Sequence, residues 1–211
     1  MNLMYSPPTL DDLIRLLRAW RFWLLAAVAG ALIGAAVYFV APPPYRARAT
    51  ANVDFNLEQA WPQDTDRQQF YYLEREVRKL EEIAWSDAVM QSVANADGKA
   101  TVSELRDGKL QLSQPAEAGW HFFADDSNAE RAEALASSWA QSFTEAAQSN
   151  LSAQEGLNSF IKIEVTQAGK LPKQRSAPLS AYLLVGTLAA WFIGVFVFLF
   201  FDFGARKRAE R

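Results

Sequence analysis

The sequence predicts an α+β domain carried between two transmembrane helices, and three observations lead to this prediction. Two apolar runs, 22–40 and 179–201, are each long enough to cross a bilayer. The 138 residues between them, 41–178, contain stretches of helical and of strand periodicity. Their predicted order is strand, helix, strand, strand, helix, strand. This order is typical of a split β-α-β, ferredoxin-like sheet with its helices on one face.

Both apolar runs have the length of a membrane-spanning helix. At about 1.5 Å of rise per residue, the 19 residues of the first run make roughly 28 Å of helix, and the 23 residues of the second make roughly 34 Å. The hydrocarbon core of a bilayer is about 30 Å thick, so both runs fit, the second with some tilt. The alternative is a buried core helix, but a small soluble domain seldom buries 23 uncharged residues in one helix.

The first run is predicted to be an uncleaved anchor. Its 19 apolar residues exceed the roughly 7–15 that are usual in a signal peptide. Ala41 and three prolines follow the run, and they suit an extended exit from the membrane better than a cleavage site.

The flanking charges predict the orientation of the chain. Basic residues lie outside both runs: Arg15, Arg18 and Arg21 before the first, and Arg206, Lys207 and Arg208 after the second. The two flanks carry net +3 and the middle part net −6, within a total of −3. Because positive flanks stay in the cytoplasm, we expect both termini there and the middle part on the far side. The acidic middle argues against a nucleic-acid partner.

Residues 1–21 are predicted to be a cytoplasmic amphipathic segment that leads into the first span. Thr9 suits a helix cap, and Leu13 and Ile14 belong to an apolar face with arginines beside it. A plain basic flank is the alternative. Residues 202–211 are predicted to be a basic cytoplasmic tail.

Small residues recur every four positions in both spans. Gly30 and Gly34 do so in the first, and Gly186, Ala190 and Gly194 in the second. Small faces let helices approach closely in lipid, so these five are the predicted helix-packing residues. Whether the contact lies within one hairpin or between subunits is left open by the sequence.

The middle part begins with a predicted strand, in which Ala51, Val53 and Phe55 alternate with polar residues. A loop is expected at 56–64. A charged helix follows, with apolar residues at helical spacing. These are Phe70, Leu73, Val77, Leu80 and Ala84. The remaining expected elements are a helix at 87–95 capped by Ser86 and closed at Gly98, a turn capped by Thr101, a hairpin of strands at 109–113 and 120–124, a helix capped by Ser127 that ends near 152, and a strand at 160–165.

Candidate chemistry is sparse, and no enzyme is expected. The chain has no cysteine and one histidine, His121, which alone makes neither a metal site nor a catalytic triad. It is predicted to be a sheet residue. No phosphate-binding loop or nucleophile motif is present, and no cofactor or metal is expected. The cytoplasmic ends, about 30 residues, are too short for a kinase or ATPase domain.

An ordered set of motifs runs along the chain. The set begins with a cytoplasmic segment at 9–18 that leads into a span, and continues with Pro44-Tyr45-Arg-Ala-Arg-Ala-Thr50 as the exit strand. It ends with Asp126-Ser-Asn-Ala-Glu before an alanine-rich helix, and with Leu171-Pro172 and Pro178 before the second span. Together these motifs resemble the chain-length determinant (Wzz-type) family of polysaccharide co-polymerases. The resemblance covers essentially the whole chain, although the exported part is too short for the long helical arms of larger members.

The resemblance implies a homo-oligomer in the bacterial plasma membrane with its central domain periplasmic or extracellular. Such proteins regulate the chain length or export of a surface polysaccharide, such as an O-antigen of lipopolysaccharide, a capsule or an exopolysaccharide. The implied partners are further copies of the chain, membrane lipid, a separate polymerase and the nascent polysaccharide. The implied membrane-proximal motif is Leu171, Pro172 and Pro178.

Two other classes remain open at this stage. The first is a transmembrane adaptor that activates a separate cytoplasmic tyrosine autokinase of the same pathway through the basic tail. The second is an unrelated two-span sensor or scaffold whose α+β domain binds a small ligand.

Overall fold

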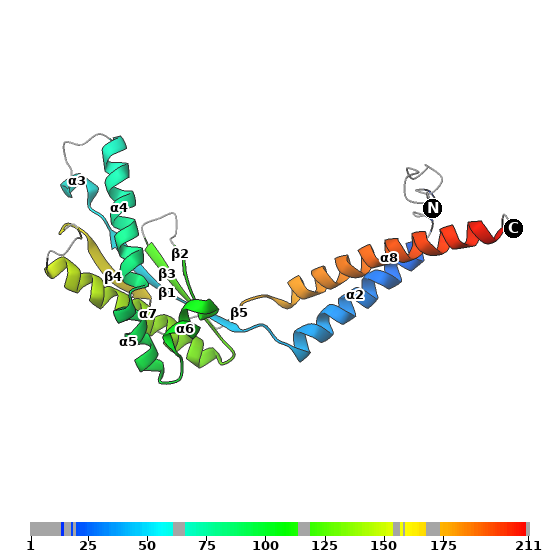
Figure 1. Ribbon diagram of the computed structural model, residues 1–211, viewed down its shortest axis with the longest axis horizontal. Coiled ribbons are helices and arrows are strands. Elements are labelled where there is room, and N and C mark those ends of the chain that lie inside the picture. The colour runs from blue at the N-terminus through cyan, green and yellow to red at the C-terminus, as the bar shows by residue number, and fades with distance from the viewer. Residues whose placement is uncertain are drawn as a thin grey trace. The chain divides into compact units, whose positions relative to one another are not determined.

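The computed structural model divides the chain into two compact units (Figure 1). One unit, residues 1–43 and 177–211, contains a pair of long helices, and the other, residues 44–176, is a mixed helix and sheet domain. The structure describes residues 14, 18, 20–60, 66–113, 119–153, 157, 159–167 and 174–209. The predicted α+β class, with an apolar helix at each end of the domain, is confirmed at this level.

The paired helices are α2, Trp20–Val40, and α8, Leu179–Ala209. Both are long and apolar enough to cross a membrane. Few of their residues are buried, and large apolar side chains such as Leu32 and Phe196 are 66% and 73% exposed. A core helix of a soluble protein would be covered on most sides. Helix α8 continues past the predicted end of the apolar run at 201, through the segment that was expected to be a separate tail.

The domain is built on one antiparallel sheet. Its strands are β1 Tyr45–Asp54, β2 Leu110–Ser113, β3 Gly119–Asp126, β4 Lys162–Gln167 and β5 Gln174–Arg175. The order is β2-β3-β1-β4, and β5 also pairs with β1. The first long strand therefore lies beside the last, as expected from a chain that leaves and returns at one end. β4 pairs with the second half of β1 and β5 with its first two residues.

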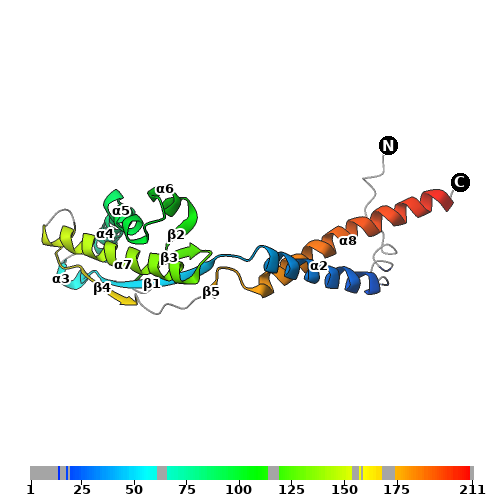
Figure 2. The same ribbon diagram turned by 90° about the horizontal axis from the view of Figure 1, so that it is seen from below.

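The longer helices cover one face of this sheet. The α-helices of the domain are α3 Leu57–Ala60, α4 Asp66–Ala84, α5 Asp87–Asp97, α6 Val102–Glu104 and α7 Ala129–Ser152. Figure 2 shows α4, α5 and α7 on the same side of the strands. Helix α7 contacts β1, β3 and β4, and α5 packs on α7.

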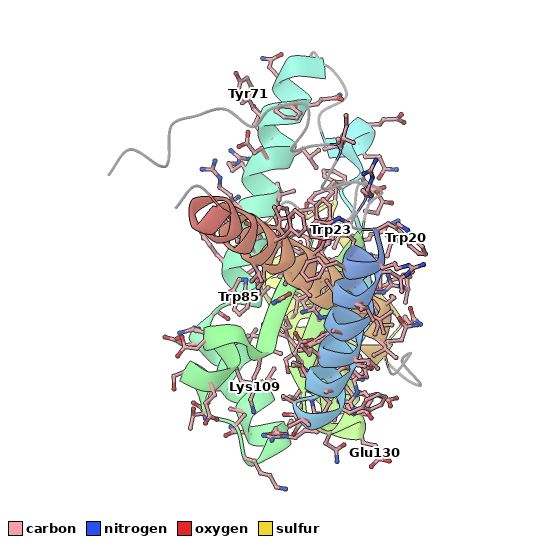
Figure 3. All side chains as sticks on the ribbon, turned by 90° about the vertical axis from the view of Figure 1, so that its right-hand side faces the viewer. Trp20, Trp23, Tyr71, Trp85, Lys109 and Glu130 are labelled. Carbon is pink, nitrogen blue, oxygen red and sulfur yellow. The ribbon has the colours of Figure 1, made fainter. Side chains whose placement is uncertain are left out.

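The inward face of β1 is narrow and apolar, with Ala47, Ala49, Ala51 and Val53 all nearly inaccessible. Their small side chains let α7 lie close to the sheet. Large rings fill the layer between them, and all are buried: Trp120 and Phe122 from β3, and Trp139 and Phe143 from α7. The Trp139 indole N–H donates to the Ala84 carbonyl at 2.9 Å, and its ring packs on Trp85 with centroids 4.8 Å apart (Trp85 is labelled in Figure 3).

Several predicted helix ends are confirmed in detail. The Ser86 hydroxyl accepts from the backbone N–H of Val89, and Gly98 ends α5 with φ +68°. Thr101 and Glu104 form a reciprocal capping box. The predicted Ser127 cap is wrong. The cap of α7 is Asn128, while the Ser127 hydroxyl donates to Asp126.

Two further expectations need correction, and one strand was not expected. The expected loop at 56–64 contains the short helix α3, and residues 61–65 lie outside the described part. Strand β5 was not anticipated. Phe70, expected on the buried face of α4, is 62% exposed because the outer turns of this helix extend past the sheet (Figure 1). Tyr71, labelled in Figure 3, lies on these turns and is 58% exposed.

A buried ion network ties α5 to the start of α7. The Arg131 guanidinium donates to both carboxylate oxygens of Asp97, at 2.8 and 2.7 Å. It also lies 3.4 Å from Asp126, whose second neighbour is the Lys109 ammonium at 3.5 Å. Both carboxylates are almost fully buried, at 7% and 4% side-chain exposure.

Candidate functional site: the helix pair and the open sheet face

The predicted small residues lie at the interface between α2 and α8. Gly30 and Gly34 are the two buried residues of α2. A Cβ on Gly30 would lie 2.9 Å from the Gly186 carbonyl carbon and 2.6 Å from the Ala190 Cβ. A Cβ on Gly34 would lie 2.9 Å from the Tyr182 carbonyl carbon. The two helices therefore meet backbone to backbone within one chain, and even a methyl group has no room there.

Gly194 belongs to the same interface, but there is room for a Cβ atom at this position. A Cβ at this position would lie 3.4 Å from the rings of Phe22 and Trp23 and 3.6 Å from the Ala26 Cβ. These are ordinary van der Waals separations. All five predicted packing residues thus lie along the contact between the helices, with the tightest approach at Gly30, Gly34 and Gly186.

Aromatic side chains join the helices beyond the small residues, and the sequence reasoning did not single them out. Tyr38 and Tyr182 make an edge contact with centroids 5.3 Å apart. Near the opposite end, the Trp23 ring lies 6.1 Å from Trp191 and 5.8 Å from Phe198. The feature of the sequence that could have identified them is the enrichment of tyrosine and tryptophan at the ends of membrane helices.

The predicted basic anchors are only partly described. Arg18 and Arg21 are exposed, and the Arg21 guanidinium lies 5.7 Å from the Trp20 ring (labelled in Figure 3). Arg15 lies outside the described residues. Arg206, Lys207 and Arg208 belong to the last turns of α8, and their side chains are not described.

The predicted proline motif is also partly described. Leu171 and Pro172 lie outside the described residues. Pro178 directly precedes α8, and its carbonyl accepts from the Ala181 N–H at 3.0 Å.

The domain presents a second surface, the sheet face opposite α4, α5 and α7 (Figure 2). Arginines alternate with the buried alanines of β1, so Arg46 and Arg48 both point to this face. They line a pocket of about 300 Å³ together with Phe123, Arg175, Gln174 and Ser176, called here the arginine pocket. The Arg-Ala-Arg-Ala alternation placed these arginines on one face in the sequence, but nothing local predicted that β5 would bring Arg175 to them.

Two contacts order the arginine pocket. The Arg46 guanidinium makes a bidentate pair with the Asp125 carboxylate, at 2.7 and 2.5 Å, and this raises the pKa of Arg46. The Arg175 guanidinium lies 3.9 Å from the centre of the Tyr45 ring, a close cation–π contact.

His121 lies on the same face, as expected of a sheet residue. Its Nδ1 is 3.0 Å from the Thr50 hydroxyl. Partial burial, and then the charge of Arg48, lower the pKa of His121. Among the described residues, no group of three His, Asp or Glu side chains is arranged to hold a metal ion.

No protein-family model matches the chain, and no curated protein matches it.

Proposed function

We propose that this protein is a polysaccharide co-polymerase, a membrane-anchored homo-oligomer that sets the chain length or export of a bacterial surface polysaccharide. It resides in the plasma (inner) membrane with both termini cytoplasmic and the domain 44–176 on the outer side. It transfers no sugar itself and acts on a separate polymerase and its nascent product. This is the function of the chain-length determinant family that the sequence resembles.

One observation carries the proposal: a single α+β domain is inserted between two apolar helices that pack tightly on each other. The two ends of the domain are adjacent, because the Ser176 N–H donates to the Pro44 carbonyl at 2.8 Å. The two helices are also adjacent at the ends that connect to the domain along the chain, where Tyr38 contacts Tyr182. Such a layout suits a domain displayed on a rigid two-helix anchor.

The sheet supports the finer form of the fold prediction. The order β2-β3-β1-β4, with every neighbouring pair antiparallel, is compatible with a ferredoxin-like, split β-α-β arrangement. The rings of Phe70 and Tyr71 on the outer turns of α4 are exposed and lie side by side, with centroids 6.4 Å apart, so they offer an apolar surface for side-by-side assembly.

Deleting the gene is expected to change the length distribution of the surface polysaccharide. The proposed role is to set when a separate polymerase stops, so loss of the protein should replace a narrow band of long chains with a broad distribution of other lengths. Polysaccharide extracted from cells with and without the gene, and from a complemented strain, would be compared on gels. An unchanged length and amount in the deletion strain would refute the proposal.

An adaptor for a cytoplasmic tyrosine autokinase is the second candidate, and one observation favours it. Helix α8 continues beyond its apolar run to Ala209 and so forms a short helical extension at 202–209. In the proposed orientation this extension is cytoplasmic and carries the basic cluster at 206–208.

Removal of residues 204–211 distinguishes the two roles. For a co-polymerase that acts through its outer domain, chain length should change little, because the helix pair and the domain remain. For an adaptor, tyrosine phosphorylation of the partner kinase should fall severalfold while oligomer size stays the same. Phosphotyrosine blots and gel filtration in detergent would measure both.

A further inference from the structure

We propose that the aromatic pair Phe70 and Tyr71 of one copy of the chain inserts into a pocket between α4 and α7 of a neighbouring copy. The proposal rests on the homo-oligomer included in the proposed function, but not on control of chain length. It adds the surface that receives the two rings, called here the α4–α7 pocket. The lining of this pocket includes Ile83, Ala88, Ala146, Ser149, Asn150 and Leu157.

The α4–α7 pocket lies at the edge of the hydrophobic core. Leu157 belongs to the core and is 8% exposed, and Ile83 and Ala146 pack against the core while they remain partly exposed. The volume of the pocket is about 620 Å³. Pockets of roughly 300–1,000 Å³ enclose drug-sized ligands, so two aromatic rings fit into this one. An apolar occupant would therefore extend the core outward.

The polar groups of the pocket suit a tyrosine. The Asn150 side-chain N–H donates to the Ala146 carbonyl at 2.9 Å, which leaves the side-chain oxygen as an acceptor. A buried tyrosine ring requires one such partner for its hydroxyl group. Lys79, which also lines the pocket, is already paired with Glu76 at 2.8 Å, so the pocket does not select an anion.

The aromatic pair has the form of an anchor for such a pocket. The two rings are exposed on the outer turns of α4 and touch in an edge contact, with an interplanar angle of 68° (Tyr71 is labelled in Figure 3). Aromatic side chains that enter a pocket dominate the energetics of most protein interfaces. The rings and the pocket are therefore complementary halves of one contact.

The aromatic pair cannot fill the pocket of its own chain. Phe70 and Ile83 belong to the same helix and are 13 positions apart. They are therefore separated by about 20 Å along the helix axis and by about 140° around it. Only another copy can bring the two halves together, and it does so head to tail, because the halves are different surfaces. Contacts of this type close into a ring or continue as an open chain.

Analytical ultracentrifugation of the full-length protein in detergent tests the proposal by measuring the Kd between copies. The ring variant is Phe70→Ala/Tyr71→Ala, and the pocket variant is Ser149→Trp, which places an indole in the pocket. The control is Gln141→Trp, the same substitution at an exposed position of α7 outside the lining. We expect the ring and pocket variants each to raise the Kd at least about 10-fold, and the control less than about 2-fold.

A combined ring and pocket variant shows whether both changes act on one contact. Its Kd should rise no further than that of the weaker-binding parent, because changes at a shared contact are not additive. Additive losses would overturn the proposal, since the rings and the pocket would then belong to separate contacts. An unchanged Kd in either variant, or a wild type that stays monomeric, would also overturn it. Circular dichroism verifies that each variant is folded.

A photoreactive benzoylphenylalanine in place of Tyr71 locates the contact without removing the ring. Its crosslink should join two copies and map to the α7 peptide that contains Ser149. Crosslinks between two peptides that both contain position 71 would overturn the proposal, because the aromatic pairs would then meet each other. Polysaccharide gels are a separate readout, so failure here leaves the chain-length proposal standing, and the reverse also holds.

Discussion

Replacing Gly186 with leucine is expected to separate α2 from α8. A side chain at this position would enter the space of the Gly30 carbonyl and would lie 3.1 Å from the Gly34 Cα already at its Cβ. Because these neighbours are backbone atoms of a helix, they cannot rotate away. Overpacking of this kind costs roughly 1–3 kcal/mol, equivalent to about a 5- to 150-fold loss of helix pairing.

An engineered disulfide measures this pairing directly. The chain has no cysteine, so Ala26→Cys/Gly194→Cys introduces the only two thiols. The Cβ positions of this pair are 3.6 Å apart, within the roughly 3.5–4.5 Å that a disulfide requires. Oxidation in membranes should give an intrachain bond in the otherwise wild-type protein. Adding Gly186→Leu should reduce its yield at least severalfold.

The matched control is Ala189→Leu, which adds a leucine of the same size to an exposed position of α8. It should leave the yield of the disulfide unchanged, because its side chain points away from α2. Disulfide-linked dimers in place of the intrachain product would show that the small faces join subunits instead. Equal yields with and without Gly186→Leu would refute the role given to that glycine.

The sequence identified the interface residues but not which helices would meet. Four-residue spacing places Gly30 with Gly34, and Gly186 with Gly194, on one face of their own helix. Their pairing across some 150 residues depends on the domain between them, whose two ends are joined at Pro44 and Ser176. The periodicity of one helix carries no information about which other helix it packs against.

Local patterns predicted the domain well where one face of an element is buried. The expected inward positions of α7, from Ala132 to Ala147, are all buried, because the 3.6-residue period and the apolar residues agree there. Strand β5 could not be predicted in this way. It is two residues long and owes its form to pairing with Tyr45 and Arg46, so no alternation identifies it.

The misplaced cap of α7 has a tertiary cause. Asp126, Ser127 and Asn128 are all good cap residues, so the sequence alone does not rank them. The Asp126 carboxylate is engaged by Arg131 and Lys109 and also accepts from the Asn128 N–H at 2.9 Å. That arrangement leaves the Asn128 side chain to accept from the first N–H groups of the helix.

Replacing Arg131 with alanine is expected to destabilise the domain by about 3 kcal/mol. The change leaves the buried Asp97 carboxylate without its cation, and truncating one partner of a buried pair typically costs roughly 3–5 kcal/mol. Because Asp97 is the last residue of α5, the negative end of the helix dipole adds to the cost. Arg78→Ala is the control, since its partner Glu74 is exposed and its loss should cost less than about 1 kcal/mol. Denaturant unfolding of the full-length protein in detergent, followed by tryptophan fluorescence, gives both values.

Acid should weaken the wild type through the same pair. The Arg131 hydrogen bonds, more than any other contact, lower the pKa of Asp97 from 3.8 to about 2. The folded state thus binds this proton less readily than the unfolded state. The stabilisation, roughly 2 kcal/mol, is therefore fully present above about pH 4 and is lost as the pH falls toward 2. Arg131→Ala should flatten this part of the stability curve, and Arg78→Ala should not. An identical loss of stability between pH 4 and 2 in wild type and Arg131→Ala would show that the network does not stabilise the fold.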